Sequence, residues 1–323
     1  MILALLAQSS LYAFIAALFI EALLRRWRIE DGAWRLRLRI LALGVAAAGP
    51  PLLLLFAPFR QSASFACFSA LYAGERWDQV RVGGYGLGGL TLLLSCGLGS
   101  ALFLRDALPP IVDVLRGSKP LPEVPPWHAA WDVLRPVVAE RAGALGIPAP
   151  AVRVVQAAAP VLLCEGIRRP VLVVSPATIE RLRGGDLDAA VAHELAHAAH
   201  RDPAWSYALV AVRAALFFNP AVQWVARAMV DDIECRADQA AVRATGGAAA
   251  LVRVIRTLFD TDHPPPSDGD ASFERVFWRI RKQGVERRCA GLERAGSAAP
   301  LPNGAVLLGA AGVALVSLLF FVV

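Results

Sequence analysis

The sequence predicts an α-helical integral membrane protein with four transmembrane helices and an inserted α+β domain. Of the 323 residues, 56% are hydrophobic and only 19% are charged, and the mean hydropathy is +0.50. This composition is too apolar for an ordinary soluble protein. Three long apolar runs lie near the amino terminus and a fourth ends the chain. A long polar block with short β-type runs separates the third from the fourth.

Each of the four apolar runs is long enough to cross a hydrocarbon layer of about 30 Å at a rise of about 1.5 Å per residue. The predicted transmembrane helices cover residues 1–24, 40–59, 86–108 and 303–323. The first has no basic amino-terminal region and no small-residue cleavage site, so we interpret it as a span and not as a signal peptide. The Gly-Pro-Pro run at 49–51 predicts a kink in the second helix, which a helix bundle tolerates.

The distribution of arginine predicts the orientation of these spans. Residues 25–39, between the first two spans, contain six arginines, whereas residues 60–85 contain three. By the positive-inside rule, the first loop and the polar block are cytoplasmic and both termini are outside. The net charge of +6 is a modest excess of basic residues, which favours contact with anionic lipids over binding to nucleic acid.

The polar block is predicted to contain a domain between two linkers. The parts are a proline-rich linker at 109–126, the domain at 127–261, and a second linker with a basic amphipathic helix at 262–302. The domain begins with a helical pattern at 127–145, and short β-type runs follow at 152–155, 161–164 and 171–175. Helical signals dominate the rest, so we expect a small antiparallel sheet packed on helices.

The most informative motif is His193-Glu194-Leu195-Ala196-His197, an HExxH sequence among helix-forming residues. Residues four apart lie on one side of an α-helix about one turn apart, so both histidines can bind one Zn²⁺. Glu194 then lies beside the metal, where it can deprotonate the metal's water. The opposite side carries Leu187, Val191 and Leu195, so we expect one side in the core and the other facing a cleft.

A catalytic zinc site needs a third protein ligand. His200 lies about 10.5 Å along the helix axis from His193, so we assign it to the lining of the cleft or to the membrane-side surface. Glu234 and Asp238 are four residues apart and share a helix face. We predict that Glu234 is the third ligand and that Asp238 accepts the free ring N–H of a ligating histidine. Cys235 points about 100° away from Glu234 and is the weaker alternative.

Together these motifs resemble the membrane-bound gluzincin metallopeptidases typified by the beta-lactam-sensing signal transducers, the penicillin-responsive antirepressor peptidases. The likeness rests on the HExxH motif followed by Arg201-Asp202-Pro203, on Phe217-Phe218-Asn219-Pro220 with Trp224, and on residues 234–238. The run at 169–174 is similar to the family's strand before the metal-binding helix, and the specific resemblance covers residues 161–242.

The resemblance implies a zinc endopeptidase of the bacterial cytoplasmic membrane, with a zincin-like domain on the cytoplasmic side. It implies that His193, His197 and Glu234 bind zinc and that Glu194 is the base. It also implies cleavage of a transcriptional repressor after an outside signal, and self-cleavage ahead of the last span. Because the chain stops at Val323, we expect no extracellular sensor domain. The signal would then arrive through the outer loop, the spans or a separate sensor protein.

Other residues are candidates for contacts with the substrate. We expect an extended peptide to add to an edge strand formed by Val171, Leu172, Val173 and Val174. The candidates for stabilising the transition state are His200, Tyr207 and Arg213. The apolar segment 205–218 is short for a span and contains Arg213, so we expect it to be buried or to lie at the interface, holding the zinc site close to the bilayer.

The second linker is predicted to have two parts. Residues 273–282 have the pattern of a basic amphipathic helix, which we expect on the anionic inner leaflet. Residues 284–302 contain several glycines and prolines, which predict an extended segment able to reach the cleft as the site of self-cleavage. A plain tether between the domain and the last span is the alternative.

Two other functions share parts of this pattern. A membrane quality-control or prenyl-protein-type zinc protease also combines HExxH with a downstream ExxxD pair. A non-catalytic signalling scaffold with structural zinc has no need of Glu194 as a base, so retained function after Glu194→Gln would favour it. The five cysteines form no CxxC pair and predict no disulfide framework.

Overall fold

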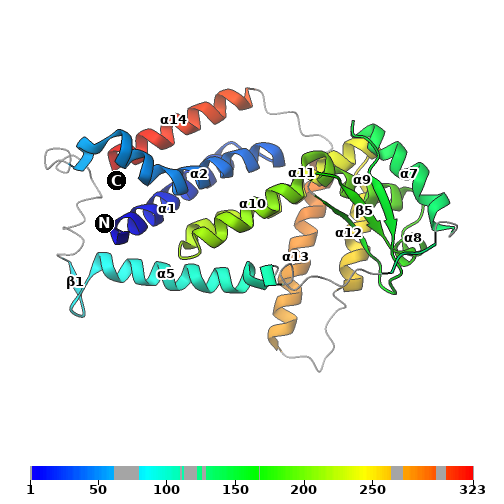
Figure 1. Ribbon diagram of the computed structural model, residues 1–323, viewed down its shortest axis with the longest axis horizontal. Coiled ribbons are helices and arrows are strands. Elements are labelled where there is room, and N and C mark those ends of the chain that lie inside the picture. Colours follow the sequence, from blue (N-terminus) through cyan, green and yellow to red (C-terminus); the bar gives the residue numbers. More distant parts are fainter. Residues whose placement is uncertain are drawn as a thin grey trace. The chain divides into compact units, whose positions relative to one another are not determined.

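The computed structural model describes residues 2–61, 80–109, 111–112, 122–125, 129–166, 168–262, 272–295 and 303–322. The described residues form two compact units. The first draws on the ranges 1–118, 207–232 and 300–323, and the second on 119–206 and 233–299. Figure 1 shows the helices and strands of both units.

Long apolar helices build the first unit (Figure 1). They are α1 (Ile2–Arg26), α2 (Gly32–Phe56), α5 (Leu87–Asp106) and α14 (Gly304–Val322), with parts of α10 (Asp202–Ala215) and α11 (Pro220–Thr245). Short elements between α2 and α5 are η1 (Pro58–Gln61), β1 (Arg81–Val82) and β2 (Tyr85–Gly86). Helices α1, α2 and α14 pack around a core in which Tyr12, Leu38 and Leu315 are fully buried.

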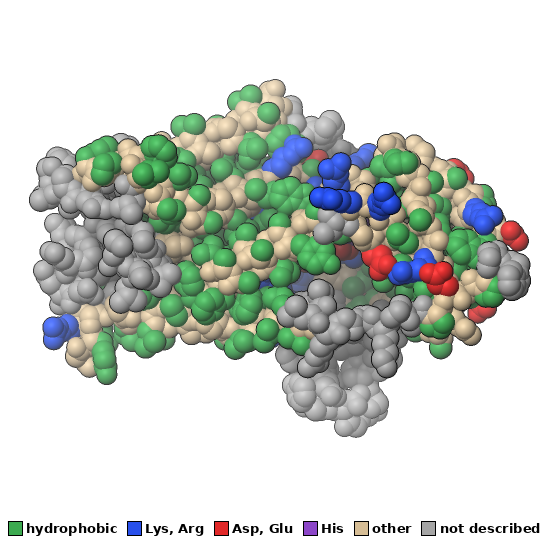
Figure 2. Space-filling model, in the orientation of Figure 1, with side chains coloured by type: hydrophobic (Ala, Val, Ile, Leu, Met, Phe, Trp, Pro, Cys, Tyr) green, Lys and Arg blue, Asp and Glu red, His purple; other side chains and the backbone are tan. Residues whose placement is uncertain are grey.

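A helix occupies each of the four predicted transmembrane ranges. Two stretches, Gly32–Leu53 and Gly89–Asp106, are long and apolar enough to cross a membrane, and Gly304–Phe320 is a shorter apolar helix. Large apolar side chains are exposed on α5 and α14, as in helices that face lipid, and Figure 2 shows hydrophobic side chains over much of one face of this unit. These features support a membrane protein, while the predicted count of four spans stays a prediction.

Charged side chains are also buried in the first unit. Arg39 of α2 is 5% exposed, and it contacts the carboxylates of Glu21 at 3.0 Å and of Asp232. Arg35 Nε donates to Asp232 Oδ1 at 2.7 Å. Because an isolated buried charge is costly, the contacts with the two arginines offset the cost of burying the Asp232 carboxylate, which is 1% exposed. The cluster joins α1, α2 and α11 within this unit.

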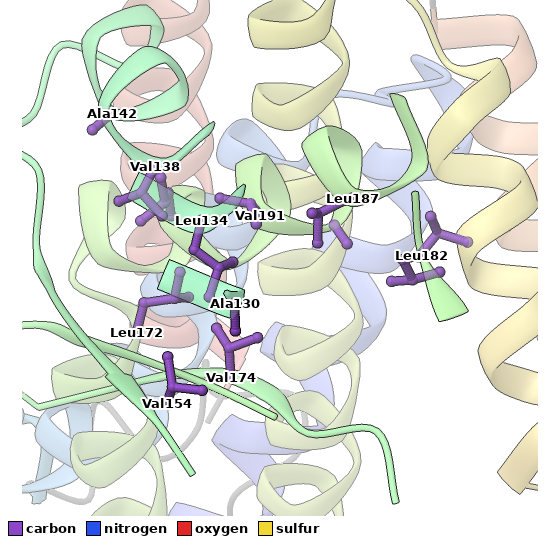
Figure 3. Packing of buried hydrophobic residues seen from close by; sticks show 13 residues of the cluster. Ala130, Leu134, Val138, Ala142, Val154, Leu172, Val174, Leu182, Leu187 and Val191 are labelled. Atoms are coloured by element: carbon purple, nitrogen blue, oxygen red, sulfur yellow. The ribbon is translucent and has the colours of Figure 1, made fainter. Parts of the chain in front are cut away.

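The second unit is an α+β domain. Its first elements are α7 (Ala130–Ala144), β3 (Ala151–Val154), β4 (Leu162–Glu165), β5 (Val171–Val174), α8 (Pro176–Arg181) and α9 (Gly185–His200). The last part of α11 follows, and then α12 (Ala249–Asp262) and α13 (Ser272–Ala295). In the core, Leu134 and Val138 of α7 and Val191 of α9 pack with Leu172 and Val174 of β5 (Figure 3).

The three strands begin and end within one residue of their predicted limits, but the sheet differs from the prediction in two respects. Its order is β3-β5-β4, with β3 parallel and β4 antiparallel to β5, so it is mixed and not antiparallel. The prediction that Val171 to Val174 form an edge strand is wrong, because β5 is the central strand. Its residues Leu172, Val173 and Val174 are at most 4% exposed, and such a continuous apolar run is typical of a strand buried on both faces. Among the described residues, β4 lies at a sheet edge.

Helix α13 corrects the predicted second linker. The glycines at 284 and 291 were expected to break the helix, yet α13 continues to Ala295. Cys289 and Leu292 of α13 are buried against α9 and α12, and this packing outweighs a cost of about 1 kcal/mol for each glycine in a helix. Residues 113–121, 263–271 and 296–302 of the predicted linkers lie outside the described part of the chain.

The two units also differ from the predicted domain at 127–261. Residues 207–232 group with the apolar helices of the first unit, and α13 belongs to the second unit although its residues were assigned to a linker. The difference at 207–232 arises because α10 and the first part of α11 pack with the apolar helices. Whether 205–218 lies at the membrane interface stays a prediction.

Candidate metal centre

Helix α9 carries the HExxH motif and has the two sides that the sequence predicts. Leu187, Val191 and Leu195 are at most 2% exposed and lie in the core beneath the helix. His193 and His197 lie on another side and are only partly buried. The apolar packing therefore fixes the rotation of α9, and the rotation presents both imidazoles together.

The two histidines meet Glu234 of α11, the predicted third ligand. The Nε2 atoms of His193 and His197 are 3.2 Å apart, and the Glu234 carboxylate oxygens lie 3.5 Å from the first and 3.7 Å from the second. Ligand atoms about 2.05 Å from one ion at tetrahedral angles are about 3.3 Å apart. The three side chains thus have the spacing of a metal site, and they form a candidate cluster in the described part of the chain.

A carboxylate lies behind each imidazole. His193 Nδ1 is 2.9 Å from Asp238 Oδ1, and His197 Nδ1 is 2.9 Å from Asp202 Oδ2. The hydrogen bond of His197 Nδ1 with Asp202 leaves the lone pair of a neutral imidazole on Nε2, the atom that faces the cluster, whereas His193 Nδ1 contacts Asp238 at close range without an aligned hydrogen bond. This donor arrangement fits a divalent metal. Asp238 holds the place the sequence predicts, whereas Asp202 was interpreted only as the start of a helix.

Residues 154–247 match the model of the BlaR1 peptidase M56 family. The match confirms the resemblance to the membrane-bound metallopeptidases, and the matched segment includes both histidines, Glu194, Glu234 and Asp238. A comparison with curated proteins finds no match. Residues 154–247 are therefore similar to the M56 peptidases, a family of metallopeptidases.

Two arginines hold the carboxylates behind the imidazoles in place. Arg288 of α13 donates from Nε to Asp238 Oδ2 at 2.6 Å and from Nη2 to Asp238 Oδ1 at 2.7 Å. Arg236 Nη2 donates to Asp202 Oδ1. The sequence analysis assigned no role to Arg236 and left Arg288 in a linker, so it missed both contacts.

The electrostatics of the site set the charge of its ligands in the metal-free protein. Burial lowers the pKa of His193, but the contacts with Asp238 and Glu234 outweigh burial and raise this pKa to about 10. Burial likewise raises the pKa of Glu234, yet the contact with His193 and the charge of Arg288 bring it down to about 2. Glu234 is therefore an anion ready to bind a cation, and His193 holds a proton that a metal must displace.

Glu194 of the HExxH motif is held from the neighbouring strand. The backbone N–H of Cys164 in β4 donates to Glu194 Oε2 at 3.0 Å. Burial raises the pKa of Glu194, since little water remains around the carboxylate. A raised pKa makes this carboxylate a stronger base than a solvated one, which suits a general base.

The remaining predicted residues do not join the cluster. His200 ends α9, and burial together with the charge of Arg236 lowers its pKa. Tyr207 and Arg213 lie in the first unit, where Arg213 Nε donates to Gln223 Oε1 at 2.9 Å. Arg213 is buried in that unit, and its predicted role in stabilising the transition state stays a prediction, as does that of Tyr207.

Proposed function

We propose that this chain is an integral membrane zinc endopeptidase that cleaves cytoplasmic or membrane-proximal proteins. The observation that carries the proposal is the cluster of His193, His197 and Glu234: the two Nε2 atoms are 3.2 Å apart, Glu234 Oε2 is 3.5 Å from that of His193, and Glu234 Oε1 is 3.7 Å from that of His197. Two imidazoles and one carboxylate are a ligand set typical of catalytic zinc, which keeps one position for water. The M56 match supports peptidase chemistry at this place.

The residues around the cluster divide the catalytic work. When bound, zinc lowers the pKa of a coordinated water and polarises the scissile carbonyl. Glu194 takes a proton from the attacking water and returns it to the leaving amine. The Cys164 N–H keeps the Glu194 carboxylate in place. Asp238 and Asp202 fix the rotation of the two imidazoles, so the ligand nitrogens need little reorganisation.

The free edge of β4 is the best candidate to bind an extended substrate. The Ser175 N–H donates to the Val161 carbonyl, and hydrogen bonds alternate along an antiparallel pair, so Leu163 and Glu165 direct their backbone groups to β5 while the N–H groups of Leu162 and Cys164 point the other way. The Cys164 N–H reaches Glu194 in that direction, which places the proposed base at the outer edge of β4. A peptide that adds to this edge as a further strand is therefore brought beside the base.

A regulatory role is the finer part of the proposal. The M56 match supports a peptidase, and the resemblance to the beta-lactam-sensing signal transducers is the ground for proposing regulated proteolysis of a transcriptional repressor or another regulator, with a separate sensor protein as a candidate partner. The six arginines at 25–39 support a cytoplasmic position for the peptidase domain, with both termini outside. Reporter fusions test this topology: fusions near Arg35 and Asp262 should report inside, and a fusion at the C-terminus should report outside.

The experiment that tests the catalytic function compares cells carrying the wild-type chain, Glu194→Gln and the exposed control Glu180→Gln. We expect intact substrate to accumulate in Glu194→Gln, while the new amino termini produced by cleavage appear in the wild type and in Glu180→Gln. Amino-terminal proteomics measures both. If Glu194→Gln yields the same cleavage products and retains function, the chain is a non-catalytic scaffold and the proposal is wrong.

A further inference from the structure

We infer that Arg288 is a positioning residue of the metal centre, and that α13 is therefore part of this centre. The inference rests on the proposed zinc site. It concerns a residue outside the matched segment 154–247, on a helix that the sequence assigned to a linker. Arg288 does not bind the metal; it acts through Asp238 and Glu234.

The Arg288 guanidinium forms a bidentate pair with one carboxylate. Its Nε and Nη2 donate to the two oxygens of Asp238 at 2.6 and 2.7 Å, and Nη2 also lies 3.2 Å from Glu234 Oε2. Two parallel N–H donors fix the plane of a carboxylate as well as its position. One guanidinium thus sets Asp238, which orients His193, and at the same time contacts the ligand Glu234.

The charges explain why this arginine is needed. Glu234 and Asp238 are two carboxylates one helical turn apart, and the side chain of Asp238 is 1% exposed. Two carboxylates at this spacing repel each other unless a cation lies against both. A rotated Asp238 carboxylate would no longer hold its place 2.9 Å from His193 Nδ1. Arg288 contacts both carboxylates and offsets their repulsion.

Packing makes the placement of Arg288 independent of the metal. Cys289 and Leu292, on the same helix, are buried in a cluster with Ala189 and Ala192 of α9 and with residues of α12. The HExxH helix and α13 therefore share one apolar interface, and Arg288 is presented from a fixed backbone. An arginine held in this way loses little conformational freedom when it forms its two hydrogen bonds.

The test uses the full-length protein in detergent with Arg288→Ala, Arg288→Lys and the matched control Arg287→Ala, whose side chain is exposed on the same helix. Zinc affinity is measured by competition with a chromophoric chelator, and the site geometry by the visible absorption of the cobalt-substituted protein. We expect Arg288→Ala to weaken zinc binding about 10- to 100-fold and to change the cobalt spectrum. We expect Arg288→Lys to lose less zinc affinity than Arg288→Ala, because it keeps the positive charge. It should still bind zinc more weakly than the wild type, because an ammonium cannot form two parallel hydrogen bonds with a carboxylate. Arg287→Ala should match the wild type.

Each outcome decides the inference. If Arg288→Ala and Arg288→Lys keep wild-type affinity and spectrum while wild-type protein binds zinc, the role of Arg288 is refuted and the proposed function stands. If Arg288→Ala does not fold, Arg288→Lys, which keeps the charge and the aliphatic stem, decides on the same two readouts. If wild-type protein binds no zinc, the proposed function fails and this inference fails with it.

Discussion

The two histidines of the metal centre are supported in the same way by different parts of the chain. His197 is backed by Asp202, five residues later, and Arg236 contacts that carboxylate from α11. His193 is backed by Asp238, forty-five residues later, and Arg288 lies another fifty residues along the chain. We call Asp202 and Arg236 the His197 arm, and Asp238 and Arg288 the His193 arm. In the His197 arm the carboxylate comes from the local turn after α9, whereas in the His193 arm both residues reach the histidine only when α11 and α13 have packed against that helix.

The two arms also differ in how many metal ligands they hold. Arg288 contacts both Asp238 and Glu234, so the His193 arm fixes two of the three ligands. Within the part of the chain that the structure describes, no ion pair joins Arg236 to Glu234, and the His197 arm fixes one ligand. Damage to the His193 arm should therefore cost more metal affinity than the same damage to the His197 arm. Substitutions at the ligands, at the carboxylates behind them and at the arginines test this difference in metal affinity.

The largest effect is expected at the ligands themselves, where the two arms are equal. His193→Ala, His197→Ala and Glu234→Ala each remove one of three protein ligands, so each purified variant should lose its zinc. Metal analysis should find about one zinc per chain in the wild type and in the control Cys235→Ala. Full zinc occupancy in Glu234→Ala would show that the third ligand is assigned to the wrong residue.

The next effect separates the arms. Asp238→Asn and Asp202→Asn keep the shape of each side chain but remove the charge that orients an imidazole. Loss of such a partner costs about 10- to 100-fold in metal affinity, and we expect Asp238→Asn at the upper end, because it also releases Arg288. Chelator competition measures both constants. A greater loss in Asp202→Asn than in Asp238→Asn would reverse the ranking of the arms.

A pH dependence follows from the proton on His193. The contacts with Asp238 and Glu234 outweigh burial and keep the pKa of His193 at about 10, while Glu234, with a pKa of about 2, is already ionised. Zinc binds the neutral imidazole, so below pH 10 this proton must leave when the metal enters. Apparent zinc affinity should rise about tenfold per pH unit between about pH 7 and 9, with release of about one proton.

Calorimetry in buffers of different ionisation enthalpy counts the protons released on zinc binding. Asp238→Asn removes the carboxylate that holds the proton, so this variant should release fewer protons at pH 8 than the wild type does. An affinity that does not change with pH in the wild type would contradict the assignment of the proton to His193.

The parts of the site that the sequence predicts are those with a local signature. Both histidines and Glu194 follow from spacing on one helix, and Glu234 with Asp238 follows from the same rule on another. Asp202 could be predicted as a partner of His197, since it stands five residues later in the sequence. An Asp-Pro pair also begins many helices, however, and this pattern alone indicates only the start of a helix. Nothing local marks Arg288, because its contacts span fifty residues.

The errors in the fold have the same origin. The strand limits follow from β-type runs, whereas the order of strands depends on long-range pairing that local patterns do not encode. The buried run at 171–174 does carry a hint, since an uninterrupted apolar strand is typical of the middle of a sheet. In α13 the glycines argued against a helix, and burial of Cys289 and Leu292 outweighed them.

The smallest effect is expected at Arg236, the outer residue of the His197 arm. Arg236→Gln removes the cation on Asp202 but leaves Asp202 beside His197 Nδ1, and no metal ligand loses a contact of its own. A charge-assisted hydrogen bond contributes about 1.5 kcal/mol or somewhat more, and only part of that reaches the metal, so zinc affinity should fall less than about tenfold. The loss should be smaller than in Arg288→Ala, and the exposed control Arg243→Gln should bind zinc as the wild type does. If Arg236→Gln weakened zinc binding more than Arg288→Ala did, the local arm would be the more important one. The contact between Arg288 and Glu234 would then contribute little to holding the metal.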